Sequence, residues 1–588
     1  MASSIFYSLR LGFSASPSHC TNNKNIPWFH QQSYSTRTVT TAIATDAPVV
    51  RRSANYPPSE WSYDFLQSLA GNHVVEKYKT TSTCLKEQVR TMISIETTVE
   101  KPLSTLELVD DLQRLGISYH FKNEISNILK KIYNCYFEAY KNWNNLDLNL
   151  KALGFRLLRQ HGYHIPQEIF EDIMDEKGHL KANVGEDIVG TLNLYEASFY
   201  AVHGDNILDV AREFITKCLK ERLEKKNIVN KSTFMLISHA LELPLYWRIP
   251  RFESIWFIEA YKGRRDMNSL LLDFAELDYN VVQGIHQEDL KFSSWWWVGL
   301  QWDKKLVFAR DRMVESFMWS VGANHEPEYS ALRRNVTKNI TMVNVIDDVY
   351  DVYGTLEELE QFTQVVRRWD VNAIEELPDY MKICFLGFYN TVNEMGYNTL
   401  INKNSFVIPY VKKAWTEYCE ANLIEARWFH SGYTPTLEEY LNNSCITVAV
   451  PIIVSGAYFL DSNDFIGEAL QNVIRWSAMV LRLADDLGTS SAELERGDVP
   501  KAVQCYMHET GVSEEEARAY IKKLILIAYK NITKERMNCK STDLQIFMEC
   551  ASNLGRMGQF TYERGDIFGA PDDLYKSHQM SLLFEPKS

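Results

Sequence analysis

The first 45 residues of this 588-residue chain contain no aspartate or glutamate. They are rich in serine and threonine, include Arg10, Lys24 and Arg37, and lack the apolar core of about 7–15 residues that a secretory signal needs. Such a composition is typical of a transit peptide for a plastid or a mitochondrion. We therefore expect residues 1–50 to be a leader and the mature protein to begin near Arg51.

The ten cysteines include no pair with C-x-x-C spacing, which disfavours a zinc site, a redox dithiol and a secreted disulfide framework. Long apolar runs are missing as well. The most apolar stretch, residues 445–460, contains Pro451 and is shorter than the ~20 residues that a membrane span needs. We interpret it as a buried, kinked core helix and predict no membrane span.

Positive charge is in deficit: 62 lysines and arginines face 76 aspartates and glutamates, for a net charge of −14. A nucleic-acid partner is disfavoured, because such a protein needs a basic patch that neutralises phosphates. Local basic residues can still bind an anionic small molecule.

Glycine (26) and proline (17) are few, and neither alternating strands nor Asn-Gly hairpins are evident. From about residue 60, apolar residues recur every three or four positions, as in residues 105–121 and 270–290. Prolines cluster in the connector 242–253, which a polar stretch follows. Because the chain is too long for one core, we predict an all-α fold in two helical domains, residues 51–268 and 269–588.

The segment NVIDDVYDVYG, residues 344–354, places three aspartates within five positions among apolar neighbours. On a helix, Asp347 and Asp351 lie about 40° apart, and Asp348 is turned away by about 100°. Two like charges on one face destabilise a helix unless a cation bridges them, and the apolar flanks fit a solvated acidic face poorly. Oxygen ligands favour a hard cation such as Mg²⁺, completed by water and phosphate oxygens.

A second oxygen-rich stripe lies in residues 481–498, where Asp485, Thr489 and Glu493 are spaced i, i+4, i+8 and Asp486 points elsewhere. An acidic helix N-terminus with capping Ser and Thr is the alternative interpretation. Taken together, two such stripes facing one cavity predict several Mg²⁺ ions with a polyphosphate between them.

Four motifs resemble those of plant monoterpene synthases, the class I terpene synthases of the angiosperm monoterpene clade. Residues 347–351 match DDxxD, residues 485–493 match (N/D)Dxx(S/T)xxxE, Arg310-Asp311-Arg312 matches RxR, and Arg51-Arg52 with Trp61 matches RRx₈W. The similarity runs from about residue 51 to the C-terminus. It implies a C-terminal α-bundle with the active site and an N-terminal α-barrel-like domain.

The resemblance also implies the reaction, that of a carbon–oxygen lyase acting on phosphates. Geranyl diphosphate would be ionised with Mg²⁺ or Mn²⁺, isomerised to linalyl diphosphate and closed to a cyclic monoterpene of the limonene or α-terpineol type. Charge develops on the leaving diphosphate, so metal ions and arginines aimed there stabilise the transition state. The implied location is the plastid (chloroplast) stroma. The choice between monomer and homodimer stays open.

Site residues follow from the same resemblance, motif by motif. Three metal ions are assigned to Asp347, Asp351, Asp485, Thr489 and Glu493. The diphosphate is assigned to Arg310, Arg482 and Lys501, the pocket wall to Trp319, Ile340 and Tyr562, and the lid to Arg51, Arg52 and Trp61. Arg312 lies roughly 200° from Arg310 on a regular helix, so both reach the ligand only if that segment is irregular.

Departures from the family pattern leave the product open. Cys445 stands where many relatives have Trp, Asn344 stands where Thr is common, and the N-terminal domain lacks a D-x-D-D motif. The alternatives are an acyclic synthase of the linalool or myrcene type, and a sesquiterpene synthase using farnesyl diphosphate, which the leader and RRx₈W disfavour. A chain-elongating prenyltransferase would carry a second DDxxD, and intact metal residues disfavour an inactive scaffold.

Overall fold

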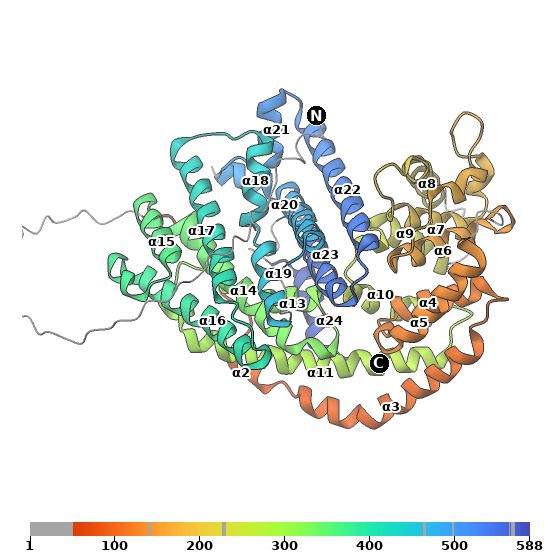
Figure 1. Ribbon diagram of the computed structural model, residues 1–588, viewed down its shortest axis with the longest axis horizontal. Coiled ribbons are helices and arrows are strands. Elements are labelled where there is room, and N and C mark those ends of the chain that lie inside the picture. The colour runs from red at the N-terminus through yellow and green to blue at the C-terminus, as the bar shows by residue number, and fades with distance from the viewer. Residues whose placement is uncertain are drawn as a thin grey trace, which may run out of the picture.

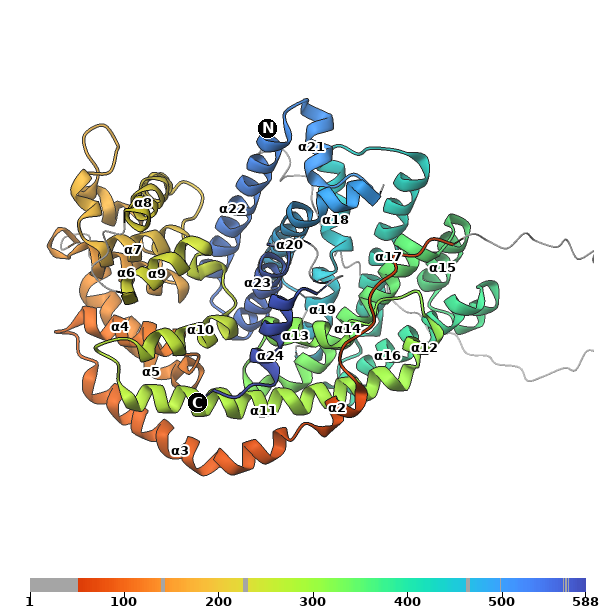
Figure 2. The ribbon, with the colours of Figure 1, turned by 180° about the vertical axis from the view of Figure 1, so that it is seen from behind.

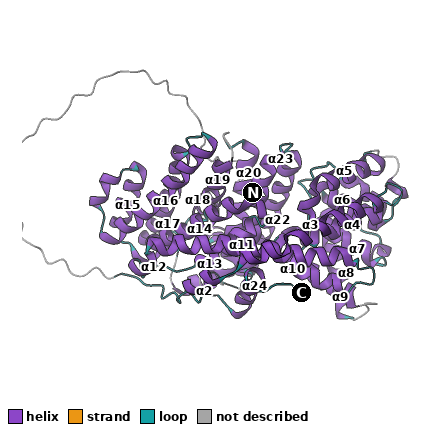
Figure 3. Ribbon diagram, turned by 90° about the horizontal axis from the view of Figure 1, so that it is seen from below, coloured by secondary structure: helices purple, strands orange, loops and turns teal. Residues whose placement is uncertain are grey.

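The computed structural model describes residues 51–138, 143–225, 231–461, 466–496, 499–563, 565, 568 and 571–587. The leader expected at residues 1–50 lies outside them. The described residues form helices, turns and loops with no β-strand, apart from an isolated bridge between Met174 and Leu180 (Figure 3). The predicted all-α class is confirmed.

Two helical lobes lie side by side, and the long helices α3 and α11 pack against each other along one edge of both (Figure 1). The N-terminal region comprises α2 (Tyr63–Ser68), α3 (Gly71–Glu96), α4 (Pro102–Arg114), α5 (Lys122–Ile132), α6 (Leu148–Gln160), α7 (Ile188–Ser198), α8 (Asn206–Glu224), α9 (Lys231–Glu242) and α10 (Pro250–Lys262). The predicted boundary near residue 268 falls in the connector between α10 and α11 and stays a prediction.

The C-terminal lobe is a bundle of longer helices. Its elements are α11 (Ser269–Leu300), α12 (Trp302–Lys305), α13 (Met313–Ala323), α14 (Ser330–Asp348), α15 (Leu356–Arg368), α16 (Asp379–Lys403), α17 (Ile408–Ser431), α18 (Leu437–Thr447), α19 (Val450–Asp461), α20 (Glu468–Arg496), α21 (Ala502–Thr510), α22 (Glu514–Asn538), α23 (Thr542–Tyr562) and α24 (Asp573–Leu583).

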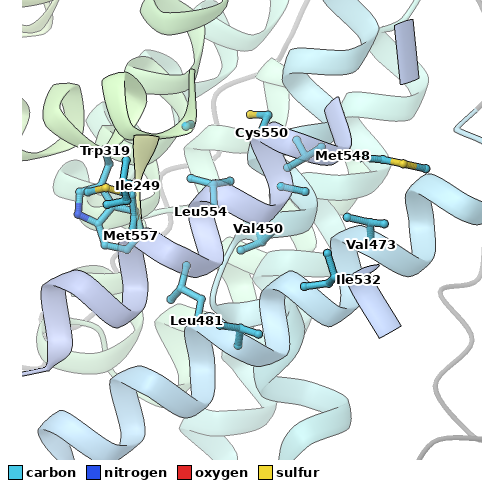
Figure 4. Close-up of a cluster of buried hydrophobic side chains, with 14 of the residues drawn as sticks. Ile249, Trp319, Val450, Val473, Leu481, Ile532, Met548, Cys550, Leu554 and Met557 are labelled. Atoms are coloured by element: carbon cyan, nitrogen blue, oxygen red, sulfur yellow. The ribbon is translucent and has the colours of Figure 1, made fainter. Parts of the chain in front are cut away.

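Helix α20 lies at the centre of this bundle and packs along α23 and α22. Leu481 of α20 and Leu554 of α23 meet in a buried cluster, to which Met557 of α23 and Trp319 of α13 also belong (Figure 4). Burial of such side chains stabilises the folded state by roughly 1.5–3 kcal/mol each. The bundle thereby holds α13, α14 and α20, which carry the predicted site residues, in fixed positions.

The apolar stretch predicted to be a kinked core helix forms two helices. Leu437–Phe459 is the one region of the described residues that is long and apolar enough to span a membrane, and most of it is buried in the bundle. Helix α18 ends at Thr447, Ala449 adopts a left-handed φ of 65°, and α19 begins at Val450. The kink and the burial agree with the interpretation as core.

Candidate active site

The aspartate-rich segment lies where α14 ends. Asp347 and Asp348 are the last residues of α14, and Asp351 lies in the following π-helical turn, Val349–Tyr353. The expectation of one regular helix through Asp351 was therefore wrong. The wide turn is closed by Gly354, whose N–H donates to the Val349 carbonyl at 2.9 Å and whose position leaves no room for a Cβ beside that oxygen. Such turns are frequent at functional sites.

One face of α14 and of the turn after it is more accessible to solvent than the rest. The Asp351 side chain is exposed, that of Asp347 is 30% exposed, and Asn344 and Ile340 retain 8% and 5%. Asp348 is fully buried, as expected for a residue on another face. Accessibility thus decreases with depth along the face that carries the two predicted metal ligands of this helix.

The pKa of the Asp351 carboxyl reflects the charged groups around it. Its side chain touches solvent, yet the surrounding protein raises its pKa well above the usual range, and the neighbouring Asp347 raises it further. Glu425 of α17 acts in the same direction, whereas Lys501 and Arg310 lower the pKa. Lys501, which precedes α21, therefore lies within electrostatic reach of Asp351.

The second motif lies on α20, as one stripe of a continuous helix. Arg482 forms a short ion pair with Asp485 and a second ion pair, 2.8 Å long, with Asp486. The Thr489 hydroxyl donates to the Asp485 carbonyl at 3.0 Å, so its lone pairs remain available as ligands. Glu493 falls within α20, but its side chain lies outside the described residues.

The second aspartate of each motif has a structural role. Asp348 accepts the backbone N–H of Arg310 at 2.8 Å, and Asp486 accepts the backbone N–H of Ala502 at 3.0 Å. Asp486 also accepts the Tyr440 hydroxyl at 3.0 Å. Both carboxylates are fully buried, and burial raises the pKa of Asp348 to about 6 against the opposing charge of Arg310. Asp348 thus fixes the loop that carries Arg310, and Asp486 fixes the loop that carries Lys501; both are predicted diphosphate contacts.

The two arginines of the RxR motif point to different partners. Residues 310–312 form a non-helical segment before α13, as the spacing argument required. Arg310 pairs closely with Asp347 and contacts Asp348 at 3.0 Å, so it lies on the aspartate-rich motif. Arg312 is buried and donates to the carbonyls of Phe568 (3.2 Å) and Pro57 (3.1 Å). Its contact with Pro57 holds the extended N-terminal segment, residues 51–61, which is called the N-terminal strand below although it belongs to no sheet.

Arg51 fastens this strand to the start of α15. Its guanidinium makes two hydrogen bonds of 2.8 Å to the Glu358 carboxylate and one of 3.0 Å to the Tyr353 carbonyl. Glu358 also closes the capping box of Thr355. Glu358, the N3 residue that completes the capping box of α15, therefore binds the lid shortly after the π-helical turn of the aspartate-rich motif.

Arg52, Tyr56 and Trp61 continue the attachment along the strand, which runs in red across the bundle in Figure 2. Arg52 donates to the Asp351 carbonyl at 3.1 Å. The Tyr56 ring lies 5.1 Å from the Arg310 guanidinium, and Trp61 packs on Phe584 with ring centroids 4.9 Å apart.

Three predicted wall residues lie around the same region. Trp319 on α13 is 6% exposed and meets Phe568 edge to face at 5.8 Å. Ile340 is on the accessible face of α14, and Tyr562 ends α23. A Cβ on Gly488 would lie 2.2 Å from the Tyr562 carbonyl oxygen, so glycine alone allows α23 to approach the second motif this closely.

The donor set fits hard divalent cations. In the described part of the chain, no three His, Cys, Asp or Glu side chains converge closely enough to hold a metal by themselves. Mg²⁺ typically takes one or two carboxylates and fills the remaining positions with water and phosphate oxygens. Asp347 with Asp351, and Asp485 with Thr489, offer oxygen ligands of this kind.

Several residues of the site were not predicted from the sequence: Tyr56, Glu358, Glu425 and Tyr440. Tyr56 lies within the RRx₈W stretch, so its place in the lid could have been noticed. Thr355 and Glu358 form a recognisable T-x-x-E capping signal. Nothing local indicates that Arg51, 307 residues away, binds that glutamate.

Comparison with known proteins agrees with this geometry. Residues 60–241 match the family model for the terpene synthase N-terminal domain, and residues 299–531 match the terpene synthase metal-binding domain. An R-linalool synthase of Artemisia annua, named as chloroplastic, is 50% identical over 94% of this chain and 98% of its own. A (−)-α-terpineol synthase of Vitis vinifera is 48% identical over 92% of this chain and 91% of its own.

Solved structures show the same fold. A limonene synthase crystallised with 2-fluorolinalyl diphosphate superposes with a TM-score of 0.87 at 41% identity, covering 92% of this chain and all of that one. Isoprene synthase of grey poplar, in complex with three Mg²⁺ ions and a dimethylallyl thiolodiphosphate, gives 0.81 at 41% identity, over 90% and 99% of the two chains. The chain therefore belongs to the terpene synthase family, in its plant monoterpene synthase branch, and is a lyase of the class that acts on prenyl diphosphates.

Proposed function

We propose that this enzyme ionises geranyl diphosphate with Mg²⁺ or Mn²⁺, isomerises it to linalyl diphosphate and closes the ring. It releases diphosphate and a cyclic monoterpene of the limonene or α-terpineol type. The lid carries the proposal that the linalyl intermediate is retained, as ring closure requires, because Arg51 and Arg52 bind beside the aspartate-rich motif. A covered site retains the linalyl intermediate and excludes bulk water while the chain turns about its C2–C3 bond.

Asp347 and Asp351 on one side of the cavity, and Asp485, Thr489 and Glu493 on the other, would hold three metal ions. The three Mg²⁺ ions in the related isoprene synthase support that number. When bound, the ions supply Lewis-acid charge that stabilises the departing diphosphate. Arg310, Arg482 and Lys501 carry cationic groups on the same cavity and bind the diphosphate oxygens.

The cavity wall protects the carbocation. The aromatic faces of Trp319 and Tyr562 stabilise positive charge without acting as nucleophiles, and Ile340 shapes the space near the floor. Residues 269–588 form the catalytic domain, and residues 51–268 form the N-terminal domain that supplies the lid strand. The leader of residues 1–50 and the chloroplastic name of the linalool synthase relative support a location in the plastid stroma.

An acyclic product is the second candidate, favoured by the 50% identity with an R-linalool synthase. In that case the linalyl cation reacts before ring closure. The lid geometry is compatible with both outcomes, since retention of the intermediate precedes either one.

The test is gas chromatography–mass spectrometry of products formed by a protein starting at Arg51. It is given geranyl or farnesyl diphosphate, with Mg²⁺ or Mn²⁺ and then with chelator. We expect metal-dependent C10 products from geranyl diphosphate, mainly cyclic ones. Mainly acyclic C10 products would select the second candidate, and products from farnesyl diphosphate alone would overturn the proposed substrate.

A further inference from the structure

Asn344 is a polar residue on the accessible face of α14, which in the proposed function borders the carbocation. It lies on α14 three residues before Asp347, so it sits about 4.5 Å deeper along the helix axis and on an adjacent part of the same face. Its side chain belongs to the accessible face, with 8% of the residue exposed, whereas Thr341 and Val345 beside it retain 2% or less.

The orientation of the Asn344 amide follows from its hydrogen bonds. The Ser316 hydroxyl on α13 donates to the Arg312 carbonyl at 2.7 Å. A hydroxyl has one proton, so Ser316 can only accept from Asn344. The Asn344 contact with Ser316, 3.2 Å long, must therefore come from the amide nitrogen. The amide oxygen of Asn344 is therefore the atom left to act as an acceptor.

An acceptor in this position can orient water. A water molecule that donates one proton to the Asn344 oxygen keeps a lone pair for an electrophile on its other side. We propose that Asn344 holds the water that captures the monoterpenyl cation, so that this enzyme ends its reaction by forming a tertiary alcohol. The inference rests on the proposed function and specifies how the cation is consumed.

The capture step balances without a further reagent. The water oxygen donates its lone pair to the cationic carbon and forms the C–O bond. The resulting oxonium loses one proton, which passes to the released diphosphate or to solvent. The net change from C10 cation and water is one alcohol and one proton. Either an acyclic or a cyclic tertiary cation can react in this way.

The experiment compares wild-type enzyme with Asn344→Leu, a variant of similar volume without the acceptor. Both are given geranyl diphosphate in H₂¹⁸O, and products are separated by gas chromatography–mass spectrometry. We expect the wild type to make an alcohol that carries ¹⁸O. We expect Asn344→Leu to lower the ratio of alcohol to olefin about tenfold, the effect of ~1.4 kcal/mol between competing barriers. Total turnover should change less than this ratio, because the ionising residues are intact.

Two matched variants separate this role from general disturbance of the wall. Ser316→Ala releases the Asn344 amide and should lower the alcohol ratio partly. Thr341→Val removes a hydroxyl one turn away, off the accessible face, and should leave the ratio unchanged. Melting temperatures verify that all variants are folded.

Each outcome has a distinct meaning. Olefins alone from the wild type, an alcohol without ¹⁸O, or an unchanged ratio in folded Asn344→Leu would overturn the role of Asn344 and leave the proposed function standing. Absence of any C10 product from wild-type enzyme would instead refute the proposed function, and this inference with it.

Discussion

The backbone N–H of Arg310 donates to the buried carboxylate of Asp348 at 2.8 Å, while the guanidinium of the same arginine reaches the accessible Asp347. The backbone contact holds the loop in place, and the side-chain contact belongs to the proposed diphosphate site. Asp348 fixes where the loop lies, and the side chain remains able to exchange one anionic partner for another. We expect Arg310 to move from Asp347 to the diphosphate when Asp347 takes up a metal ion.

Substitutions of the neighbouring residues Asp485 and Asp486 on α20 should have opposite effects: the first on activity, the second on stability. Asp485→Asn should lower kcat/KM at least a hundredfold, because it removes a metal ligand, and should change the free energy of unfolding by less than about 1 kcal/mol. Asp486→Ala should cost about 3–5 kcal/mol of stability, because it leaves Arg482 and the Ala502 N–H buried without this partner. Urea unfolding and steady-state kinetics measure both. Equal destabilisation by the two variants would contradict the assigned roles.

Arg51→Ala tests the lid. We expect turnover of geranyl diphosphate to fall about tenfold or more, and turnover of supplied linalyl diphosphate to fall much less, because the second substrate bypasses isomerisation. The Arg51–Glu358 pair is partly exposed, so stability should change by less than about 1 kcal/mol. Arg51→Lys should give an intermediate loss, since lysine cannot bind the carboxylate in two places. Equal losses with both substrates would exclude a role in isomerisation.

Gly488→Ala tests the close approach of α20 and α23. The added methyl would collide with the Tyr562 carbonyl and push the second motif away from the first, costing on the order of 1–3 kcal/mol and most of the activity. Gly299→Ala in α11 is the control, because that position is helical and open, and alanine there should stabilise by roughly 0.5–1 kcal/mol. If Gly488→Ala were as active and stable as wild type, the packing described here would be incorrect.

Acid stability depends on Glu253 in the N-terminal domain. Burial alone would raise its pKa, but Arg114 and His239 outweigh it and lower the pKa from 4.5 to about 2. The unfolded chain therefore binds the proton first as pH falls. About 3 kcal/mol of stability, complete above pH 4.5, should be lost between pH 4.5 and 2.

Unfolding of wild type and Glu253→Gln by urea, measured from pH 6 to pH 3, checks this prediction. The gap in stability between the two proteins should shrink as pH falls. A gap that stays constant over this range would show that Glu253 gains its proton equally in both states.

Local patterns predicted the parts of the site that depend on helical periodicity. The spacing of Asp485 and Thr489 was sufficient to predict one turn of the same helix between them, because α20 is continuous there. The spacing of Asp347 and Asp351 predicted neighbouring carboxylates, but the π-helical turn was missed because it depends on how Gly354 closes the loop.

Contacts between distant segments could not be predicted. Sequence reasoning gave Arg312 no definite partner, because both arginines could reach the ligand only in an irregular segment; in the structure it binds the carbonyls of Pro57 and Phe568, far apart in the sequence. A periodic pattern describes one helix at a time. The partners of a buried arginine depend on which carbonyls the whole fold leaves without donors nearby.

The docked strand has a practical consequence for anyone who purifies or immobilises this enzyme. With Arg52 on the Asp351 carbonyl, a tag or linker joined directly to Arg51 would lie at the entrance of the active site. The other end of the chain is a better attachment point. The backbone N–H of Lys587 donates to Asn280 of α11, and the label C lies on this helix at the lower edge of the molecule in Figure 2. Fusion partners placed there leave the entrance clear.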